Sequence, residues 1–286
     1  MRRFCLVILC AVPTLLTAQP PMQLTLTQAQ QLAIQNNPRS FEIKHAFLGR
    51  PYSDAEVDAA VNRPFIGLQA SARRSDNICA EAARLLSEGH VFGWFQGCSE
   101  FGPRALGHRS ILADPRQASM KDKLNLRVKH RQAFRPFAPI VLAERAHEIF
   151  DGDQDSPYML MAKNVKPEWR DKIPAVVHVD GTARVQMVRP EHSERLYRLL
   201  KEFDALTGVP VLVNTSFNVK GEPIVEAPQD ALSCFLTTGI DYLAMHDLLI
   251  EKRPFNRIVV PVTNFFAEVS TLVTTAMTAD SRPPAR

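Results

Sequence analysis

The sequence predicts an α/β fold in which a mixed twisted sheet is flanked by helices. From residue 41 onward, short apolar runs of strand length alternate with helical segments, which is the pattern of α/β domains. The chain has 286 residues, of which 45% are hydrophobic, so it can bury one core of ordinary domain size. We therefore expect a single main domain over residues 41–256.

Start and stop signals place the predicted helices. Gly89 and Gly208 each follow a helical segment, and glycine readily takes the left-handed conformation that ends a helix. Pro103 suits the first position of a helix, because its missing N–H is not needed there. The predicted helices cover 77–88, 105–112, 120–130, 193–206 and 229–237.

The predicted strands are short apolar runs bounded by turn residues. Asp180-Gly181 can form a tight turn, so we expect a hairpin of 176–179 with 184–188. A polar cluster, 214–218, follows one apolar run, and ligands favour that edge of an α/β sheet. The other predicted strands cover 91–95, 137–142, 209–213 and 242–246.

The first 18 residues follow the pattern of a secretory signal peptide. Arg2 and Arg3 precede an apolar stretch that ends in small or polar residues. That stretch is shorter than the roughly 20 residues needed to cross a bilayer, so we expect no membrane span in the mature chain. A frayed hydrophobic N-terminus is the alternative interpretation.

Both remaining terminal segments are expected to lie outside the main domain. Residues 19–40 form an amphipathic segment, in which 24–38 resembles the opening helix of mature outer-membrane efflux proteins. A generic amphipathic helix explains so short a match equally well. The tail over 257–286 is expected to be partly disordered.

Bulk composition excludes some function classes. A net charge of +4 is too small to indicate nucleic acid as a partner. The five cysteines contain no C-x-x-C pair, so a disulfide framework is not expected. The histidines lack the spacing of helical zinc ligands, and we therefore predict no protein-held metal.

The densest polar motif lies in 96–110, where glycines surround Arg104 and Arg109. Free amides at the start of a helix, together with guanidinium groups, favour phosphate or carboxylate oxygens. A structural turn with surface arginines is the alternative. The motif is not a P-loop, because His108 and Arg109 stand where that loop has lysine and a hydroxyl residue.

Further polar groups are expected at the ends of other elements. Taken singly, each of these groups has a purely structural explanation as part of a solvated face, an exposed hairpin or a capped loop. Together they provide the cations, hydroxyls and amides that a polyanionic nucleotide requires. These residues are Lys129, Arg131, Arg135, His178, Asp180, Arg184, Asn214, Thr215, Ser216 and Asn218.

Four motifs carry a resemblance to a known family. They are EFGPRALGHRSILADPR (100–116), FRPFAP (134–139), HVDGTARVQ (178–186) and NTSFNVKGEPIV (214–225). In order and spacing they resemble the C-terminal, YrdC-like domain of the carbamoyltransferases of nodulation-factor and antibiotic tailoring. The resemblance runs from about residue 45 to residue 252.

The resemblance implies a function and a site. The C-terminal domain of that family uses carbamoyl phosphate and ATP, with Mg²⁺, to form carbamoyladenylate, and an N-terminal domain transfers the carbamoyl group to an acceptor hydroxyl. Adenylation needs cations rather than a nucleophilic side chain. The implied catalytic residues are Arg104, Arg109, Lys129 and Ser216. The implied substrate-binding residues are Arg131, Arg135, His178, Asp180, Arg184, Asn214, Thr215 and Asn218.

Two features depart from the family pattern. About 40 residues of unrelated sequence stand where the transferase domain is expected, so transfer calls for a separate domain or subunit. The signal-like N-terminus also conflicts with the cytoplasmic location of ATP and carbamoyl phosphate. The alternatives are a stand-alone activating subunit, a fused reading frame, and an inactive or exported nucleotide- or anion-binding fragment.

Overall fold

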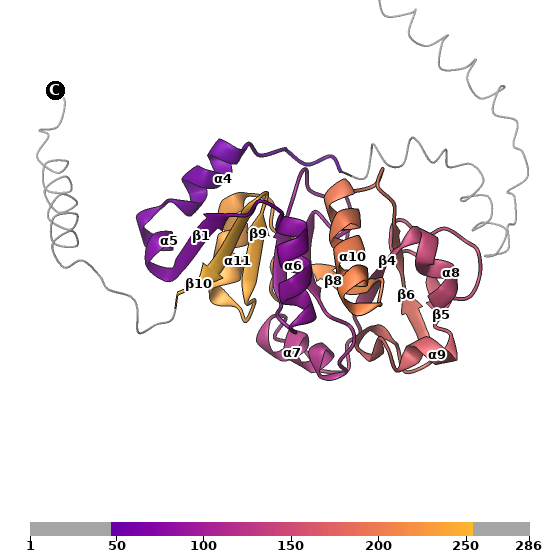
Figure 1. The fold of residues 1–286 in the computed structure, drawn as a ribbon. Helices are drawn as coiled ribbons and strands as arrows, with labels where there is room; N and C mark the ends of the chain where they lie inside the picture. The colour runs from indigo at the N-terminus through magenta and orange to yellow at the C-terminus, as the bar shows by residue number, and fades with distance from the viewer. Residues whose placement is uncertain (1–46, 254–286) are drawn as a thin grey trace, which may run out of the picture. The chain divides into compact units, whose positions relative to one another are not determined.

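The computed structural model describes residues 47–253 (Figure 1). The predicted signal peptide, the amphipathic segment and the tail over 257–286 lie outside these described residues. Within the described range, no helix is both long enough and apolar enough to cross a membrane.

An eight-stranded mixed sheet forms the centre of the described region, which confirms the expected fold class. Its strand order is β1-β10-β9-β2-β3-β8-β4-β7. The β2–β9 and β4–β7 pairs are parallel, and the other pairs are antiparallel. The strands are β1 Ala70–Arg74, β2 Phe92–Phe95, β3 Arg109–Ala113, β4 Ala138–Leu142, β7 Gln186–Val188, β8 Val211–Ser216, β9 Tyr242–Met245 and β10 Leu248–Lys252. A separate two-stranded sheet pairs β5 (Ala162–Asn164) with β6 (Thr182–Arg184).

Helices cover both faces of the large sheet. On one face, α6 (Ile78–Ser87) packs beside α10 (Glu194–Thr207) across the strands, as Figure 1 shows. On the other face lie α7 (Ser119–Arg127) and α11 (Pro228–Thr237). Successive side chains of β2 alternate between these layers, because a strand directs neighbouring residues to opposite faces.

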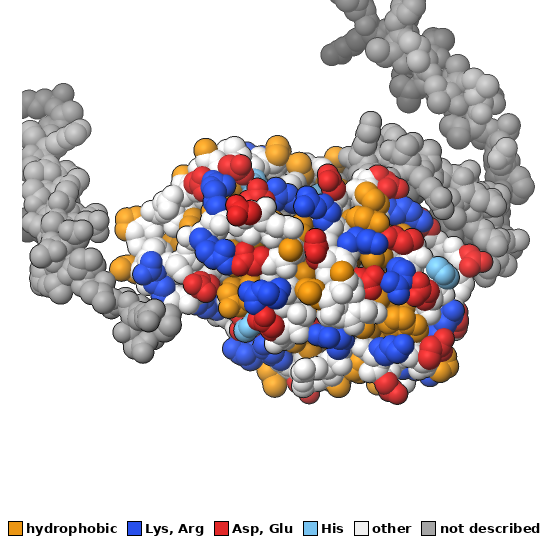
Figure 2. Space-filling view, viewed as in Figure 1, with side chains coloured by type: hydrophobic (Ala, Val, Ile, Leu, Met, Phe, Trp, Pro, Cys, Tyr) orange, Lys and Arg blue, Asp and Glu red, His pale blue; other side chains and the backbone are white. Residues whose placement is uncertain are grey.

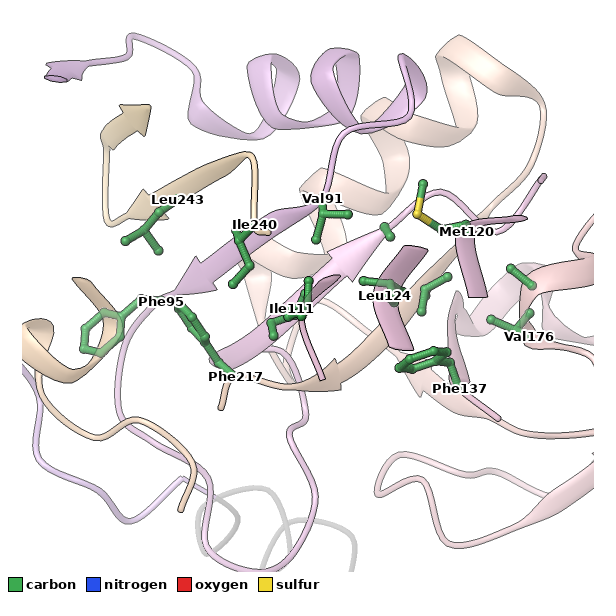
Figure 3. Packing of buried hydrophobic residues seen from close by; sticks show 14 of the residues in the cluster. Val91, Phe95, Ile111, Met120, Leu124, Phe137, Val176, Phe217, Ile240 and Leu243 are labelled. Carbon is green, nitrogen blue, oxygen red and sulfur yellow. The ribbon is translucent and has the colours of Figure 1, made fainter. Parts of the chain in front are cut away.

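The core on the α7 and α11 face is continuous from β2 to β4. Figure 3 shows Phe95, Ile111 and Phe217 in this layer, together with Leu124 of α7 and Phe137. Each of these five side chains is at most 3% exposed. The packing fixes the end of α7 against the sheet, and the residues that follow α7 belong to the candidate site.

Short helices complete the described region. Ser53 Oγ accepts the Glu56 N–H at the start of α4, and the Glu56 carboxylate accepts the Ser53 N–H, so the two residues form a capping box. The remaining helical elements are α4 Asp54–Val61, α5 Pro64–Gln69, η1 Ala143–Arg145, α8 Ala146–Ile149, α9 Pro167–Arg170 and η2 Pro174–Val176.

The structure corrects two sequence predictions. The expected helix over 105–112 does not form, because Gly107 has φ +106°, which is outside the helical region, and β3 begins at Arg109. The expected hairpin is also wrong. The turn at Gly181 exists, but η2 precedes it, and β6 and β7 belong to different sheets.

Candidate functional site

One group of the predicted site residues meets at the end of β8. Lys129, just after α7, is 5% exposed. Its Nζ donates to Ser216 Oγ at 3.2 Å, to Asn218 Oδ1 at 2.8 Å and to both backbone carbonyls. Ser216 Oγ donates to Asn218 Oδ1 at 2.7 Å. The structure thus joins two motifs that lie far apart in the sequence.

The charge of Lys129 is sensitive to its surroundings. Burial, and to a smaller extent the positive charge of Arg131, lowers the pKa of Lys129 to about 7. Its hydrogen-bond partners within residues 47–253 are all neutral groups. An anion placed beside this amine favours the charged form, so ligand binding and protonation are coupled here.

Two arginines follow Lys129 on the same segment. The Arg131 guanidinium lies 4.8 Å from the centre of the Phe137 ring, and its Nε donates to Asn125 Oδ1 at 2.7 Å. Burial lowers the pKa of Arg131, and the nearby charge of Arg135 lowers it further. The Arg135 side chain is exposed and has no hydrogen bond or ion pair with any described residue. No carboxylate neutralises these two cations in the described part of the chain.

The glycine-rich segment forms a loop whose amides already hold an anion. Glu100 Oε1 accepts hydrogen bonds from the backbone N–H groups of Leu106 (2.8 Å), His108 (2.7 Å) and Arg109 (3.1 Å). Backbone amides arranged in this way form an anion-binding turn. The expectation that its amides are free for a ligand is wrong, because a carboxylate of the chain occupies them.

Arg109 is held inside the core. Its side chain is fully buried, and the guanidinium lies 3.6 Å from the centre of the Phe95 ring. Its Nη1 donates to the carbonyls of Gln96 (2.7 Å) and His108 (3.2 Å). Its Nη2 is buried without a hydrogen-bond partner among the described residues. The bonds of Nη1 give Arg109 a role in holding the loop, while the hydrogen-bonding capacity of Nη2 is unused.

Arg104 and Arg184 form a pair of cations without an acidic partner. Burial lowers the pKa of Arg184, and the charge of Arg104 lowers it further. The Arg184 Nε is buried and has no hydrogen-bond partner among the described residues. Arg104 is half-buried, and within 47–253 it too lacks a hydrogen bond or ion pair. This pair can accept an anion without breaking an existing contact.

Strand β8 connects two cationic groups: Lys129 with the arginines that follow it, and the pair Arg104 and Arg184. Asn214 Nδ2 donates to the Ala105 carbonyl at 3.0 Å and to Gln186 Oε1 at 2.9 Å, and Gln186 Nε2 donates to the Leu106 carbonyl at 2.8 Å. These amides hold the loop of Arg104 against the strand that also carries Ser216. Asn214 Oδ1 is buried without a described partner. Thr215 is half-buried beside them on β8.

His178 and Asp180 form a closed turn. Asp180 Oδ1 accepts the Thr182 N–H at 3.0 Å and the Thr182 hydroxyl at 2.7 Å, and these bonds lower the pKa of Asp180. Burial lowers the pKa of His178, against the effect of Asp180. The neutral form of His178 is therefore favoured, and the turn leads directly into Arg184.

Three polar residues, of which two are buried and Glu100 is half-buried, organise the site but were not predicted from the sequence. Glu100, Asn125 and Gln186 each bond the backbone of a loop that carries cations. A signal existed for Gln186, which is a polar residue inside an apolar run. Glu100 and Asn125 have no local signal, since acids and amides are common in loops and on helices.

A cavity of about 570 Å³ lies beside the Lys129 group, and none of the predicted site residues lines it. Its walls are His130, Val219, Glu222, Pro223, Ile224, Val225, Asp230, Ser233, Cys234 and Thr237. Among the described residues, no group of three or more His, Cys, Asp or Glu side chains is arranged to hold a metal ion.

Comparison with known proteins decides the family. Residues 83–252, more than half of the chain, match the model of the family described as "Carbamoyltransferase C-terminus". The chain belongs to this family. All twelve predicted site residues of this carbamoyltransferase domain lie within the matched range.

Curated relatives are similar over most of this chain. Nodulation protein NolNO of Sinorhizobium fredii is 46% identical over 205 residues, covering 70% of this chain and 30% of that protein. Nodulation protein NolO of Bradyrhizobium diazoefficiens is 46% identical over 185 residues, covering 64% and 34%. An uncharacterized protein of Synechocystis is 42% identical over 227 residues, covering 72% and 37%. The chain thus spans about a third of the length of these relatives.

Among solved structures, HypF of T. kodakarensis is similar with a TM-score of 0.43 and 17% sequence identity. The similarity covers 64% of this chain and 22% of that one. At this score it supports no statement about the site.

Proposed function

We propose that this carbamoyltransferase domain binds ATP and carbamoyl phosphate and forms carbamoyladenylate with release of pyrophosphate. The observation that carries the proposal is the pair Arg104 and Arg184, two half-buried cations without an acidic partner among the described residues. Such a pair is stabilised by a bound polyanion. Mg²⁺ arrives with ATP as part of the substrate.

The proposed reaction has two steps. Water cleaves carbamoyl phosphate to carbamate and inorganic phosphate. A carbamate oxygen then attacks the α-phosphorus of ATP, which forms the new P–O bond of carbamoyladenylate, while the bond to the β-phosphate oxygen breaks and pyrophosphate leaves. Charge builds on the α-phosphate and on the leaving group, so positioned cations lower the barrier without a protein nucleophile.

In this proposal, each of the two cationic groups binds a different set of phosphate oxygens. Arg104 and Arg184 bind one set of phosphate oxygens. Lys129, Arg131 and Arg135 bind the other, and Lys129 takes up a proton as the anion arrives, because its pKa is about 7 in the absence of ligand. Ser216 and Asn218 hold the Lys129 amine in place.

Transfer of the carbamoyl group belongs, in this proposal, to a separate domain or subunit. The chain spans about a third of the length of its curated relatives. Because both substrates are cytoplasmic metabolites, we propose that the activation step takes place in the cytoplasm.

The test is ATP–pyrophosphate exchange by the full chain, with and without carbamoyl phosphate. We expect carbamoyl phosphate to stimulate exchange and Arg104→Ala or Arg184→Ala to reduce it by about 100-fold, as for the loss of one transition-state donor. Arg84→Ala is the matched control, because Arg84 is an exposed arginine paired with Glu88 on α6. Its exchange rate should equal that of the parent. A chain that binds ATP but never exchanges pyrophosphate is a nucleotide-binding fragment and contradicts the proposal.

A further inference from the structure

A buried asparagine holds the segment that carries two of the site cations. Asn125 lies on α7 and is fully buried. Its Oδ1 accepts a hydrogen bond from Arg131 Nε at 2.7 Å, and its Nδ2 donates to the carbonyls of Ala133 and Arg135, each at 3.1 Å. Its backbone carbonyl accepts the Arg131 N–H at 3.0 Å. One residue therefore contacts the segment at three positions.

The segment has few other restraints. Helix α7 ends at Arg127, and His130, at φ 45°, turns the chain into the left-handed region. Residues 130–137 then run to β4 without helix or strand. The other backbone bond within this stretch is local, from the Arg135 N–H to the Gln132 carbonyl. The side-chain amide of Asn125 and its backbone carbonyl thus both tie this loop to the packed helix.

Loss of that amide has a specific consequence. The α7 helix is fixed by its buried side chains, such as Leu124, so it stays in place when the Asn125 side chain is shortened. Two loop carbonyls then lose their donor, and the Arg131 guanidinium loses the acceptor that orients it. The loop samples more conformations, and each ligand contact must first restore the ordered one.

We propose that Asn125 is a positioning residue that sets Arg131 in the orientation in which it binds the phosphates of ATP. This inference rests on the proposed function and adds to it a residue that touches no substrate. Because Arg131 binds ATP before the reaction, the loss falls on substrate binding. Asn125→Ala should raise the KM for ATP by about 10- to 30-fold and change kcat by less than about threefold.

The test is a double-mutant cycle in ATP–pyrophosphate exchange and in calorimetric ATP binding. It compares the full chain with its Asn125→Ala, Arg131→Ala and Asn125→Ala/Arg131→Ala variants. If Asn125 acts through Arg131, the double variant is no more than about threefold worse than Arg131→Ala. Asn125→Asp keeps the acceptor for Arg131 and should recover at least about threefold relative to Asn125→Ala. Leu199→Ala, a buried change on the opposite face, serves as the control for destabilisation alone and should leave the KM for ATP unchanged.

The outcomes separate the two proposals. A chain that neither binds ATP nor exchanges pyrophosphate, or that is indifferent to Arg131→Ala, contradicts the proposed function and with it this inference. If Arg131→Ala raises the KM but Asn125→Ala does not, or if the two losses multiply in the double variant, the proposed function stands and the positioning role of Asn125 is wrong.

Discussion

At the scale of single residues, a carboxylate inside the glycine-rich loop takes the place that a ligand anion occupies in related turns. Glu100 Oε1 accepts three backbone N–H bonds in the loop that also carries Arg104. In Glu100→Ala these amides lose their partner. Hydrogen bonds to a charged group contribute about 1.5–3 kcal/mol each and are not additive. We expect the free energy of unfolding, measured with urea, to fall by about 2–4 kcal/mol.

Formate or acetate should restore part of the stability of Glu100→Ala, because a free carboxylate can bind the vacated amides. Chloride at equal ionic strength controls for general salt effects. Glu88→Ala removes an exposed carboxylate and should show neither the loss nor the recovery. A Glu100→Ala protein as stable as the parent contradicts the role given to this carboxylate.

Lys129 makes stability depend on pH in a defined window. Its pKa is about 7 in the folded protein and 10.5 in its ordinary state. Between these values the unfolded chain binds a proton that the folded chain does not, so the free energy of unfolding rises with pH. Lys129→Met removes this contribution. We expect the gain in stability from pH 7 to pH 9, measured with urea, to be smaller in Lys129→Met than in the parent, and equal gains contradict the lowered pKa.

The sequence indicates the types of residue in the site better than their individual roles. Arg104 and Arg109 look alike in the motif, yet one is half-buried without a described partner and the other is fully buried against carbonyls and Phe95. The difference arises from β3, which begins at Arg109 and lies between β2 and β8. Pairing with β8 involves residues about a hundred positions away, and a local motif carries no information about it.

At the scale of elements, local signals suffice where a helix has its own caps. Gly208 ends α10 with φ 70°, as the sequence predicts, and Asn77 caps α6. The expected helix over 105–112 fails because its apolar residues fit a short strand as well as a helix, and tertiary pairing decides between them. Strand β8 likewise extends to Ser216, beyond the predicted end of its apolar run, because residues 214–216 pair with β3.

The space around two glycines, one on β2 and one on α5, predicts opposite effects of their substitution on the free energy of unfolding. A Cβ at Gly93 meets Phe217 Cζ at 2.9 Å and Leu243 Cδ1 at 3.0 Å, and both side chains belong to the layer in Figure 3. Gly93→Ala should therefore lower the free energy of unfolding by about 1–3 kcal/mol. Gly67, in helix α5, has open space around it, so Gly67→Ala should raise it by about 0.5–1 kcal/mol. Urea denaturation of both variants checks the pair, and a stable Gly93→Ala protein contradicts the tight packing.

At the scale of the whole molecule, the charges do not form a field of one sign on the face that carries α6 and α10. Figure 2 shows Lys and Arg side chains interspersed there with Asp and Glu. The net charge of the chain is only +4. In the proposed function, attraction of the anionic substrates therefore depends on local groups such as Arg104 and Arg184 rather than on long-range steering.

An added nucleophile can intercept the proposed intermediate. Carbamoyladenylate is a mixed anhydride, and hydroxylamine attacks its carbonyl carbon to give hydroxyurea and AMP. We expect the full chain to form hydroxyurea and AMP in equal amounts, each with one pyrophosphate, when ATP and carbamoyl phosphate are both present. Because carbamoyl phosphate alone yields some hydroxyurea, the ATP-free reaction sets the background. If the Arg184→Ala variant forms as much ATP-dependent hydroxyurea as the parent, the activation does not take place at the site that contains Arg184. If AMP forms without hydroxyurea, the chain hydrolyses ATP instead of activating the carbamoyl group.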